Sequence, residues 1–389
     1  MQANALVAHG GGPTSVLNAT LLGVVQEARA VNIHHLWAPR GGLGGLLRGD
    51  LLDLLAVPQS KIAKLYQQCS SAIGSFRGKI SVADLGKIVR LFRTSEIRYF
   101  FYTGGNGSMG TTLRIAAAAH EAGYELISLG IPKTIDNDIC LTDHCPGFGS
   151  AARFAITALR EMGLDQRALP TPVSIVEVMG RNTGWLAAST LLARGRDDDP
   201  PHFIYVPEVP FDLAEFLDRV EGLLRAQKWV MGVVAEGLRD CSGRMIASSR
   251  GSSRDARGRP LAGDVASFLA RLISQKLGAR ARSEKPGLLY RAFAPCQSPV
   301  DAAEAFAAGR FAVRSALKGN SEAMVSLQRA RSKHYSCTFK LVPLRQVADK
   351  ERRLPEKHML KPANIRDSYR AYAAPLIGPP LIPPVHFLM

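Results

Sequence analysis

The 389-residue sequence contains no apolar run that approaches the roughly 18 residues a membrane-spanning helix needs. Its amino terminus has neither the basic start nor the long apolar stretch of a signal peptide. The six cysteines are scattered, with no CxxC pair and no metal-ligand spacing, so we expect reduced, structural thiols. These absences predict a cytoplasmic protein without a membrane partner.

The sequence also lacks a recognisable nucleic-acid-binding module, although its formal net charge is +16. A nucleic-acid surface should show a clustered basic stripe. Here the basic residues are spread along the chain and are densest at 250–259 and 345–353. The charge therefore favours attraction of phosphorylated small molecules over nucleic acid. A generally basic surface is the alternative interpretation.

The composition, 46% hydrophobic and 21% charged, is that of a globular protein, and the length predicts two domains. Apolar, β-rich runs alternate with helical patterns, as in parallel βαβ units. The clearest such pairs are residues 5–9 and 17–30, 99–103 and 111–122, and 126–131 and 150–162. We therefore expect an α/β fold with two doubly wound, Rossmann-like domains whose sheets are largely parallel.

Three glycine-rich turns follow expected strands, at residues 10–15, 41–45 and 104–108. Glycine lets backbone N–H groups approach an anion closely, and a following helix presents its positive amino end. Together the turns predict a polyphosphate cradle. A single turn of this kind would be explained equally well by steric needs alone.

The strongest local signal is the segment 132–138, which directly follows an apolar run. Asp136 and Asp138 lie two residues apart, so in an extended segment they share one side. One could accept a hydroxyl proton while the other steadies a cation, and phosphoryl transfer needs both functions. Lys133 and Mg²⁺ would neutralise charge on the transferring group. The alternative is a solvated turn rich in Asp and Asn.

The order of these motifs resembles the phosphofructokinase family over roughly residues 5–310. The matching segments are GGP at 11–13 with Asn18, IGSFR at 73–77, GGNGS at 104–108, PKTIDND at 132–138, PGFGS at 146–150, VEVMGR at 176–181 and AEG at 235–237. The resemblance implies the phosphofructokinase fold. It also implies a glycolytic 6-phosphofructokinase, which phosphorylates the 1-hydroxyl of fructose 6-phosphate.

The resemblance also implies roles for single residues. Asp136 would be the general base, Thr134 and Asp138 would complete its loop, and Lys133 and Arg181 would act on the transferring group. The residues implied to bind the donor are Gly11, Gly12, Arg77, Gly105, Asn106, Gly107 and Ser108. Those implied to bind the sugar phosphate are Thr134, Asp136, Asp138, Met179, Gly180, Arg181, Glu236, Arg282 and Arg291. For Arg282 and Arg291, an ordinary surface arginine is an equal alternative.

The phosphoryl donor depends on two positions. In the pyrophosphate-using branch, the position that corresponds to Gly107 typically carries an acidic residue, which would exclude the α-phosphate of ATP. Lys133 replaces the glycine usual in bacterial ATP enzymes and resembles the pyrophosphate branch. Because a lysine assists either donor whereas a fixed carboxylate excludes ATP directly, Gly107 makes ATP the slightly favoured donor. Pyrophosphate is the alternative.

Three further expectations follow from the resemblance. Asn106 stands where many relatives carry a Mg²⁺-binding aspartate, and its uncharged oxygen should bind Mg²⁺ more weakly. Leu22 and Gln26 replace the effector-binding arginines of allosteric bacterial enzymes, so we expect no nucleotide effector control. The sites that family members share between subunits imply a homodimer or homotetramer.

We expect a donor-binding domain in residues 1–140 with about 255–305, and a sugar-phosphate-binding domain in residues 141–254 with about 306–340. A partly irregular extension would occupy residues 341–389. Other functions stay open: a kinase of the NAD kinase and diacylglycerol kinase superfamily, a non-catalytic paralogue that binds sugar phosphate, and a nucleic-acid-binding protein. Sedoheptulose 7-phosphate is an alternative sugar substrate.

Overall fold

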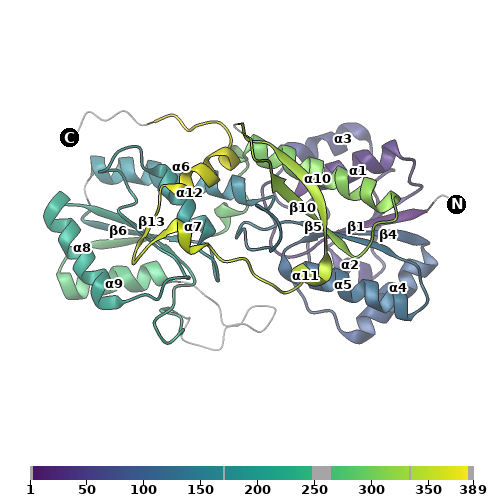
Figure 1. Cartoon of the computed structure of the whole chain (residues 1–389), viewed down its shortest axis with the longest axis horizontal. Coiled ribbons are helices and arrows are strands. Elements are labelled where there is room, and N and C mark those ends of the chain that lie inside the picture. The colour runs from purple at the N-terminus through teal and green to yellow at the C-terminus, as the bar shows by residue number, and fades with distance from the viewer. Residues whose placement is uncertain (1–2, 170, 248–263, 333, 384–389) are drawn as a thin grey trace. The chain divides into compact units, whose positions relative to one another are not determined.

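The computed structural model describes residues 3–169, 171–247, 264–332 and 334–383 (Figure 1). The chain forms two compact units, Met1–Ser150 with Arg291–Arg352, and Ala151–Tyr290 with Arg353–Met389. Each unit has one mostly parallel sheet with helices on both faces. The predicted α/β class with two doubly wound units is therefore confirmed. Among the described helices, none is long and apolar enough to cross a membrane.

The sheet of the first unit has seven strands in the order β11-β10-β5-β4-β1-β2-β3. Their bounds are β1 (Asn4–His9), β2 (Leu36–Pro39), β3 (Leu51–Asp53), β4 (Ile97–Gly104), β5 (Ile127–Pro132), β10 (Ala323–Arg329) and β11 (Cys337–Pro343). The five inner strands run parallel, and β3 and β11 pair antiparallel at the two edges. All residues of β1 are buried, as expected for a parallel strand covered on both faces.

Helices cover both faces of this sheet (Figure 1). They are α1 (Leu17–Ala30), α2 (Leu43–Leu47), α3 (Gln59–Ala63), η1 (Lys64–Gln67), α4 (Val82–Thr94), α5 (Asn106–Glu121), η4 (Ala294–Cys296), α10 (Pro299–Leu317) and α11 (Leu344–Val347). Helices α1 and α10 pack closely because each has a glycine that faces the backbone of the other helix. A Cβ on Gly23 would lie 2.0 Å from Phe306 O, and one on Gly309 would lie 2.3 Å from Thr20 O.

The second unit contains a four-stranded parallel sheet in the order β7-β8-β6-β9. The strands are β6 (Val173–Val178), β7 (Phe203–Tyr205), β8 (Val230–Ala235) and β9 (Ala281–Glu284), with a small hairpin of β12 (Met359–Leu360) and β13 (Asn364–Ile365). The helices are α6 (Phe148–Ala168), which begins in the first unit, α7 (Trp185–Ser189), η2 (Thr190–Ala193), α8 (Leu213–Gln227), α9 (Val265–Leu277), η3 (Gly287–Tyr290), η5 (Glu356–His358), α12 (Ser368–Ala373) and η6 (Ala374–Ile377).

The unit boundaries differ from those expected from the sequence. Strand β10 pairs with β5, which brings residues 306–340 into the first unit, whereas β9 pairs with β6 and belongs to the second. The expected extension at 341–389 is likewise divided between the units after Arg352. Residues 250–259, one of the two basic segments, lie outside the described residues. Hydrophobic periodicity predicts strands but not which strands pair. The sequence analysis therefore could not assign β9 and β10 to the correct sheets.

Candidate active site

The first glycine-rich turn directly follows β1 in the first unit. Gly11 has a φ of +79°, a conformation that favours glycine. A Cβ on Gly12 would lie 2.3 Å from Nη1 of Arg291 and 3.1 Å from Nη2 of Arg77. Two guanidinium groups therefore lie against this turn, and a polyphosphate bound there would meet both cations.

Lys133, which follows β5, reaches the same turn. Its Nζ donates hydrogen bonds to the carbonyl oxygens of Gly10, at 2.8 Å, and of Gly12. The side chain is buried, and this burial lowers the pKa of the amine from 10.5 to about 7, with further lowering by Arg77 and Arg291. The turn thus holds a lysine whose charge an anionic ligand would stabilise.

The other two glycine-rich turns differ in character. Gly42 has a φ of +63°, and a Cβ there would lie 2.6 Å from His9 O, so a steric need explains that turn. The third turn leads into α5, whose N-cap residue Gly105 provides no side-chain cap. Asn106 and Gly107 are partly exposed in its first turn, and Ser108 is buried behind them. N–H groups at the start of a helix can bind an anion, which agrees with the expected donor-binding role of this turn.

The acidic loop at 134–138 lies next to the start of α5. The Thr134 hydroxyl accepts a hydrogen bond of 3.0 Å from the Asp136 N–H, and Asp136 itself is partly exposed. Asn106 Nδ2 donates to Asp138 Oδ2 at 2.9 Å, and burial raises the pKa of that carboxyl. Among the described residues, the buried Oδ1 of Asn106 has no hydrogen-bond partner. An unsatisfied amide oxygen beside a carboxylate suits a hard cation such as Mg²⁺.

Arg352, which the sequence analysis did not identify, supports this loop. It is the last residue of the first unit in the sequence. Its Nε and Nη2 donate to Asn137 O at 3.2 and 2.8 Å. Its Nη1 donates to Thr142 O at 2.8 Å and to Asp143 O, and its own N–H donates to Asp138 O at 2.7 Å. The only sequence signal was the basic segment 345–353, which indicated no more than general surface charge.

The expected sugar-phosphate residues of the second unit gather where β6 and β8 end. Met179, Gly180 and Arg181 follow β6, and Glu236 follows the neighbouring strand β8. Burial raises the pKa of Glu236, whereas the Gly180 N–H and the charge of Arg181 act in the opposite direction. A Cβ on Gly237 would lie 1.8 Å from Arg181 O. This close approach explains the glycine of the AEG motif.

The structure assigns the predicted residues to both units. The first unit contains Gly11, Gly12, Arg77, Gly105, Asn106, Gly107, Ser108, Lys133, Thr134, Asp136, Asp138 and Arg291, and the second contains Met179, Gly180, Arg181, Glu236 and Arg282. Of the two arginines with an equal surface alternative, Arg291 lies against Gly12, and Arg282 is exposed on β9. Their role in binding the sugar phosphate stays a prediction.

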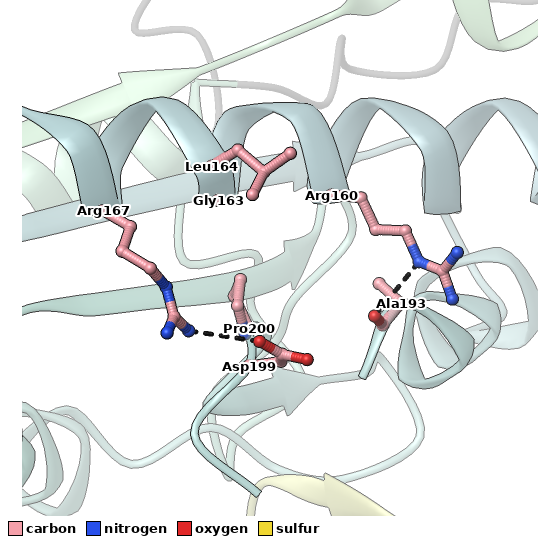
Figure 2. Close-up of a pocket in the computed structure, with 7 residues that line it drawn as sticks. All are labelled: Arg160, Gly163, Leu164, Arg167, Ala193, Asp199 and Pro200. Atoms are coloured by element: carbon pink, nitrogen blue, oxygen red, sulfur yellow. Dashed lines mark hydrogen bonds and ion pairs between the residues drawn. The ribbon is translucent and has the colours of Figure 1, made fainter. Parts of the chain in front are cut away.

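A separate pocket in the second unit lies between α6 and the segment that leads to β7 (Figure 2). Arg167 forms an ion pair of 3.1 Å with Asp199, and Arg160 donates to Ala193 O at 3.2 Å. The cavity has a volume of about 20 Å³. This space suits a water molecule and not a sugar phosphate, so the pocket is no candidate for the active site.

Comparison with known proteins identifies the family. The profile of the phosphofructokinase family matches residues 4–316. The pyrophosphate–fructose 6-phosphate 1-phosphotransferase of Xanthomonas campestris pv. campestris is 39% identical over 383 residues, which cover 96% of this chain and 91% of the relative. An ATP-dependent 6-phosphofructokinase of Amycolatopsis methanolica is 30% identical, over 83% of this chain and 71% of the relative.

The crystal structure of a pyrophosphate-dependent phosphofructokinase from Marinobacter aquaeolei superimposes with a TM-score of 0.87 at 33% identity. The match covers 99% of this chain and 94% of the other. The expected phosphofructokinase fold is therefore confirmed. By profile, sequence and structure, the chain is a phosphotransferase that belongs to the phosphofructokinase family.

Proposed function

We propose that the protein transfers a phosphoryl group between pyrophosphate and the 1-hydroxyl of D-fructose 6-phosphate, reversibly and with Mg²⁺. The relative named for this reaction in Xanthomonas campestris matches nearly the whole chain at 39% identity. The relative named as ATP-dependent is less similar, at 30%. The comparisons thus support pyrophosphate over ATP, the donor that the sequence analysis slightly favoured.

The structural observation that carries the proposal is Lys133. Its amine lies within the first glycine turn, bonded to Gly10 O and Gly12 O, with Arg77 and Arg291 close enough to lower its pKa. Three basic groups therefore surround one short turn. Such a concentration of positive charge suits a compact donor whose negative charges are all close together.

Other predicted site residues would perform the remaining functions of phosphoryl transfer. Asp136 would accept the proton of the 1-hydroxyl as that oxygen attacks the phosphorus. Lys133 and Arg181 would stabilise negative charge on the transferring group. Asn106 and Asp138 would hold Mg²⁺, which supplies charge neutralisation on the phosphate oxygens. Met179, Gly180 and Glu236 would orient the sugar phosphate.

One observation favours ATP as a second candidate donor. Gly107, in the first turn of α5, has no side chain and is partly exposed. No carboxylate stands at this position to repel an α-phosphate. The resemblance to the pyrophosphate branch would predict an acidic residue there. Gly107 is therefore the position that favours ATP over pyrophosphate as the donor.

The two donors can be distinguished by initial rates with fructose 6-phosphate and excess Mg²⁺, with pyrophosphate and ATP assayed side by side. The proposal predicts a kcat/KM at least tenfold higher with pyrophosphate, a difference of about 1.4 kcal/mol in transition-state stabilisation. A Gly107→Asp variant should then retain pyrophosphate turnover and lose any ATP turnover. Higher kcat/KM with ATP in the unmodified protein would refute the proposal.

We also propose that the protein acts as a homodimer or homotetramer in the cytoplasm. The family resemblance supports this assembly, because some phosphofructokinases share sites between subunits. Multi-angle light scattering of the purified protein measures the mass directly, against 42.0 kDa for a single chain. A monomeric mass for the active protein would contradict the proposed assembly.

A further inference from the structure

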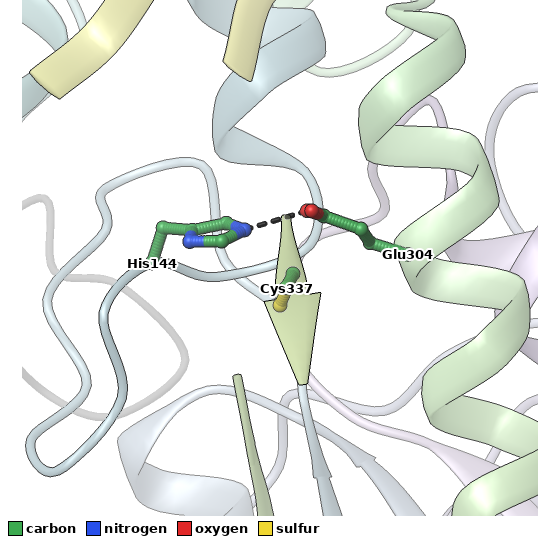
Figure 3. A group of neighbouring side chains, drawn as sticks. All are labelled: His144, Glu304 and Cys337. Atoms are coloured by element: carbon green, nitrogen blue, oxygen red, sulfur yellow. Dashed lines mark hydrogen bonds and ion pairs between the residues drawn. The ribbon is translucent and has the colours of Figure 1, made fainter. Parts of the chain in front are cut away.

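We propose that His144, Glu304 and Cys337 form a binding site for a divalent transition-metal cation, for which Zn²⁺ is the best chemical match. Their ligand atoms all lie within 4.8 Å of one another. Figure 3 shows the three side chains converging from a loop, from α10 and from the start of β11. All three belong to the first unit, and the proposed phosphoryl transfer uses none of them.

The residues around this triad are arranged as the outer shell of a metal site. The Nδ1 of His144 lies 2.9 Å from Asp143 Oδ2, which fixes the ring and turns Nε2 toward Glu304 Oε2, at 2.6 Å. The Tyr335 hydroxyl donates to the other oxygen of Glu304 at 2.5 Å. Arg329 Nε lies 3.2 Å from Asp143 Oδ2. A carboxylate behind a ligating histidine is a frequent feature of metal centres.

The donor set selects the kind of metal. One nitrogen, one carboxylate oxygen and one thiolate sulfur suit Zn²⁺, with a water as the fourth ligand, whereas Mg²⁺ and Ca²⁺ prefer oxygen alone. Binding requires Nε2 and Oε2 to separate from 2.6 Å to about 3.3 Å, the spacing of two ligands about 2 Å from a tetrahedral ion.

The place of the site in the fold indicates its effect. His144 precedes the PGFGS motif in the loop that follows the acidic segment 134–138, and Glu304 and Cys337 lie on α10 and β11. A bound ion would tie this loop to a helix and an edge strand of the same unit. We therefore infer a structural cross-link that stabilises the first unit.

Cobalt substitution tests the site in the full-length protein without an affinity tag. Metal-stripped protein is titrated with Co²⁺, and the expected result is one tightly bound ion per chain. A thiolate-to-cobalt charge-transfer band and the intense visible bands of tetrahedral Co²⁺ should appear, and Zn²⁺ should abolish both. The Cys337→Ser variant should lose the charge-transfer band. The matched control Cys241→Ser, at an exposed thiol of the second unit, should retain it.

The melting temperature provides a second readout beside the Co²⁺ spectrum. Zn²⁺ should raise the melting temperature of the unmodified protein and of Cys241→Ser, but not that of Cys337→Ser. The proposal is overturned if the unmodified protein binds no stoichiometric Co²⁺, or if the Co²⁺ spectrum is the same in Cys337→Ser. In that outcome the cluster is a hydrogen-bonded network alone.

Discussion

The charge of Lys133 should control how donor turnover depends on pH. Burial lowers the pKa of its amine from 10.5 to about 7, which corresponds to about 5 kcal/mol opposing the charged form in the ligand-free protein. A bound polyphosphate favours that charged form, so donor binding should take up a proton. By linkage, kcat/KM for the donor should be greatest below pH 7 and should fall as the pH rises through this value.

Lys133→Met removes the charge while keeping an unbranched side chain. The carbonyl oxygens of Gly10 and Gly12 lose a donor, at a cost of about 1–3 kcal/mol if no water replaces it, but a buried cation is also removed. The melting temperature near pH 7 should therefore change by only a few degrees. By contrast, kcat/KM should fall about 10²- to 10³-fold, as when one preorganised group is removed from a developing anion.

The assay measures kcat/KM for pyrophosphate between about pH 6 and pH 9 in both proteins. Ionisation of the donor affects both equally and cancels in the ratio of the two profiles. That ratio should decline above pH 7 because only the lysine protein loses a charge. Lys87→Met, at an exposed site on α4, is the control and should match the unmodified protein. A ratio that stays constant across this range would refute the reasoning.

The pH dependence of stability, measured in the unmodified protein and in Lys133→Met, tests whether folding lowers the pKa of Lys133. Lys133 has a lower pKa folded than unfolded, so between pH 7 and 10.5 the unfolded chain binds more protons. The free energy of unfolding should therefore increase with pH across this window, by up to about 5 kcal/mol from this residue alone. Denaturant unfolding of Lys133→Met should show that increase reduced. An identical pH dependence in both proteins would contradict the assigned burial.

Four further variants test other parts of the site. Asp136→Asn should lower kcat by about 10²- to 10⁴-fold with little change in melting temperature, and retained turnover would exclude Asp136 as the base. Arg352→Ala should lower kcat by a factor at least ten times larger than the factor by which the KM of either substrate changes. Added guanidinium should restore part of the activity. An absence of rescue would show that the arginine acts only through general stability. Gly237→Ala should raise the KM for fructose 6-phosphate or prevent folding, since its Cβ would lie 1.8 Å from Arg181 O; unchanged kinetics would contradict the close approach. Asn106→Asp should lower the Mg²⁺ concentration needed for half-maximal rate, measured by magnesium titration, and no change would remove Asn106 from the metal site.

The sequence predicted well those features that depend on neighbours along the chain. The βαβ rhythm predicted the α/β class. The segment 132–138 was expected at the end of a strand, and β5 does end at its first residue, Pro132. The glycine turns at 10–15 and 104–108 also follow strands, as expected. These signals are local because strand ends, turns and helix starts each require particular residues.

The sequence could not predict contacts between distant segments. Arg352 supports Asn137 across 215 positions, and nothing in its local sequence distinguishes it from other arginines. The six cysteines showed no metal-ligand spacing, yet folding brings Cys337 beside His144 and Glu304. The expected unit boundaries differ from the structure for the same reason, because packing determines the pairing of β10 with β5. In the proposed function the donor would be selected by charges from several such segments, and for this reason Gly107 and Lys133 taken singly gave opposite indications.

The reverse reaction tests the central claim most directly. The purified protein is supplied with fructose 1,6-bisphosphate and Mg²⁺, together with either inorganic phosphate or ADP as the phosphoryl acceptor, and formation of fructose 6-phosphate is followed. A pyrophosphate-dependent enzyme should form fructose 6-phosphate and pyrophosphate with inorganic phosphate and should be inactive with ADP. Formation of ATP from ADP, without turnover in inorganic phosphate, would contradict the account.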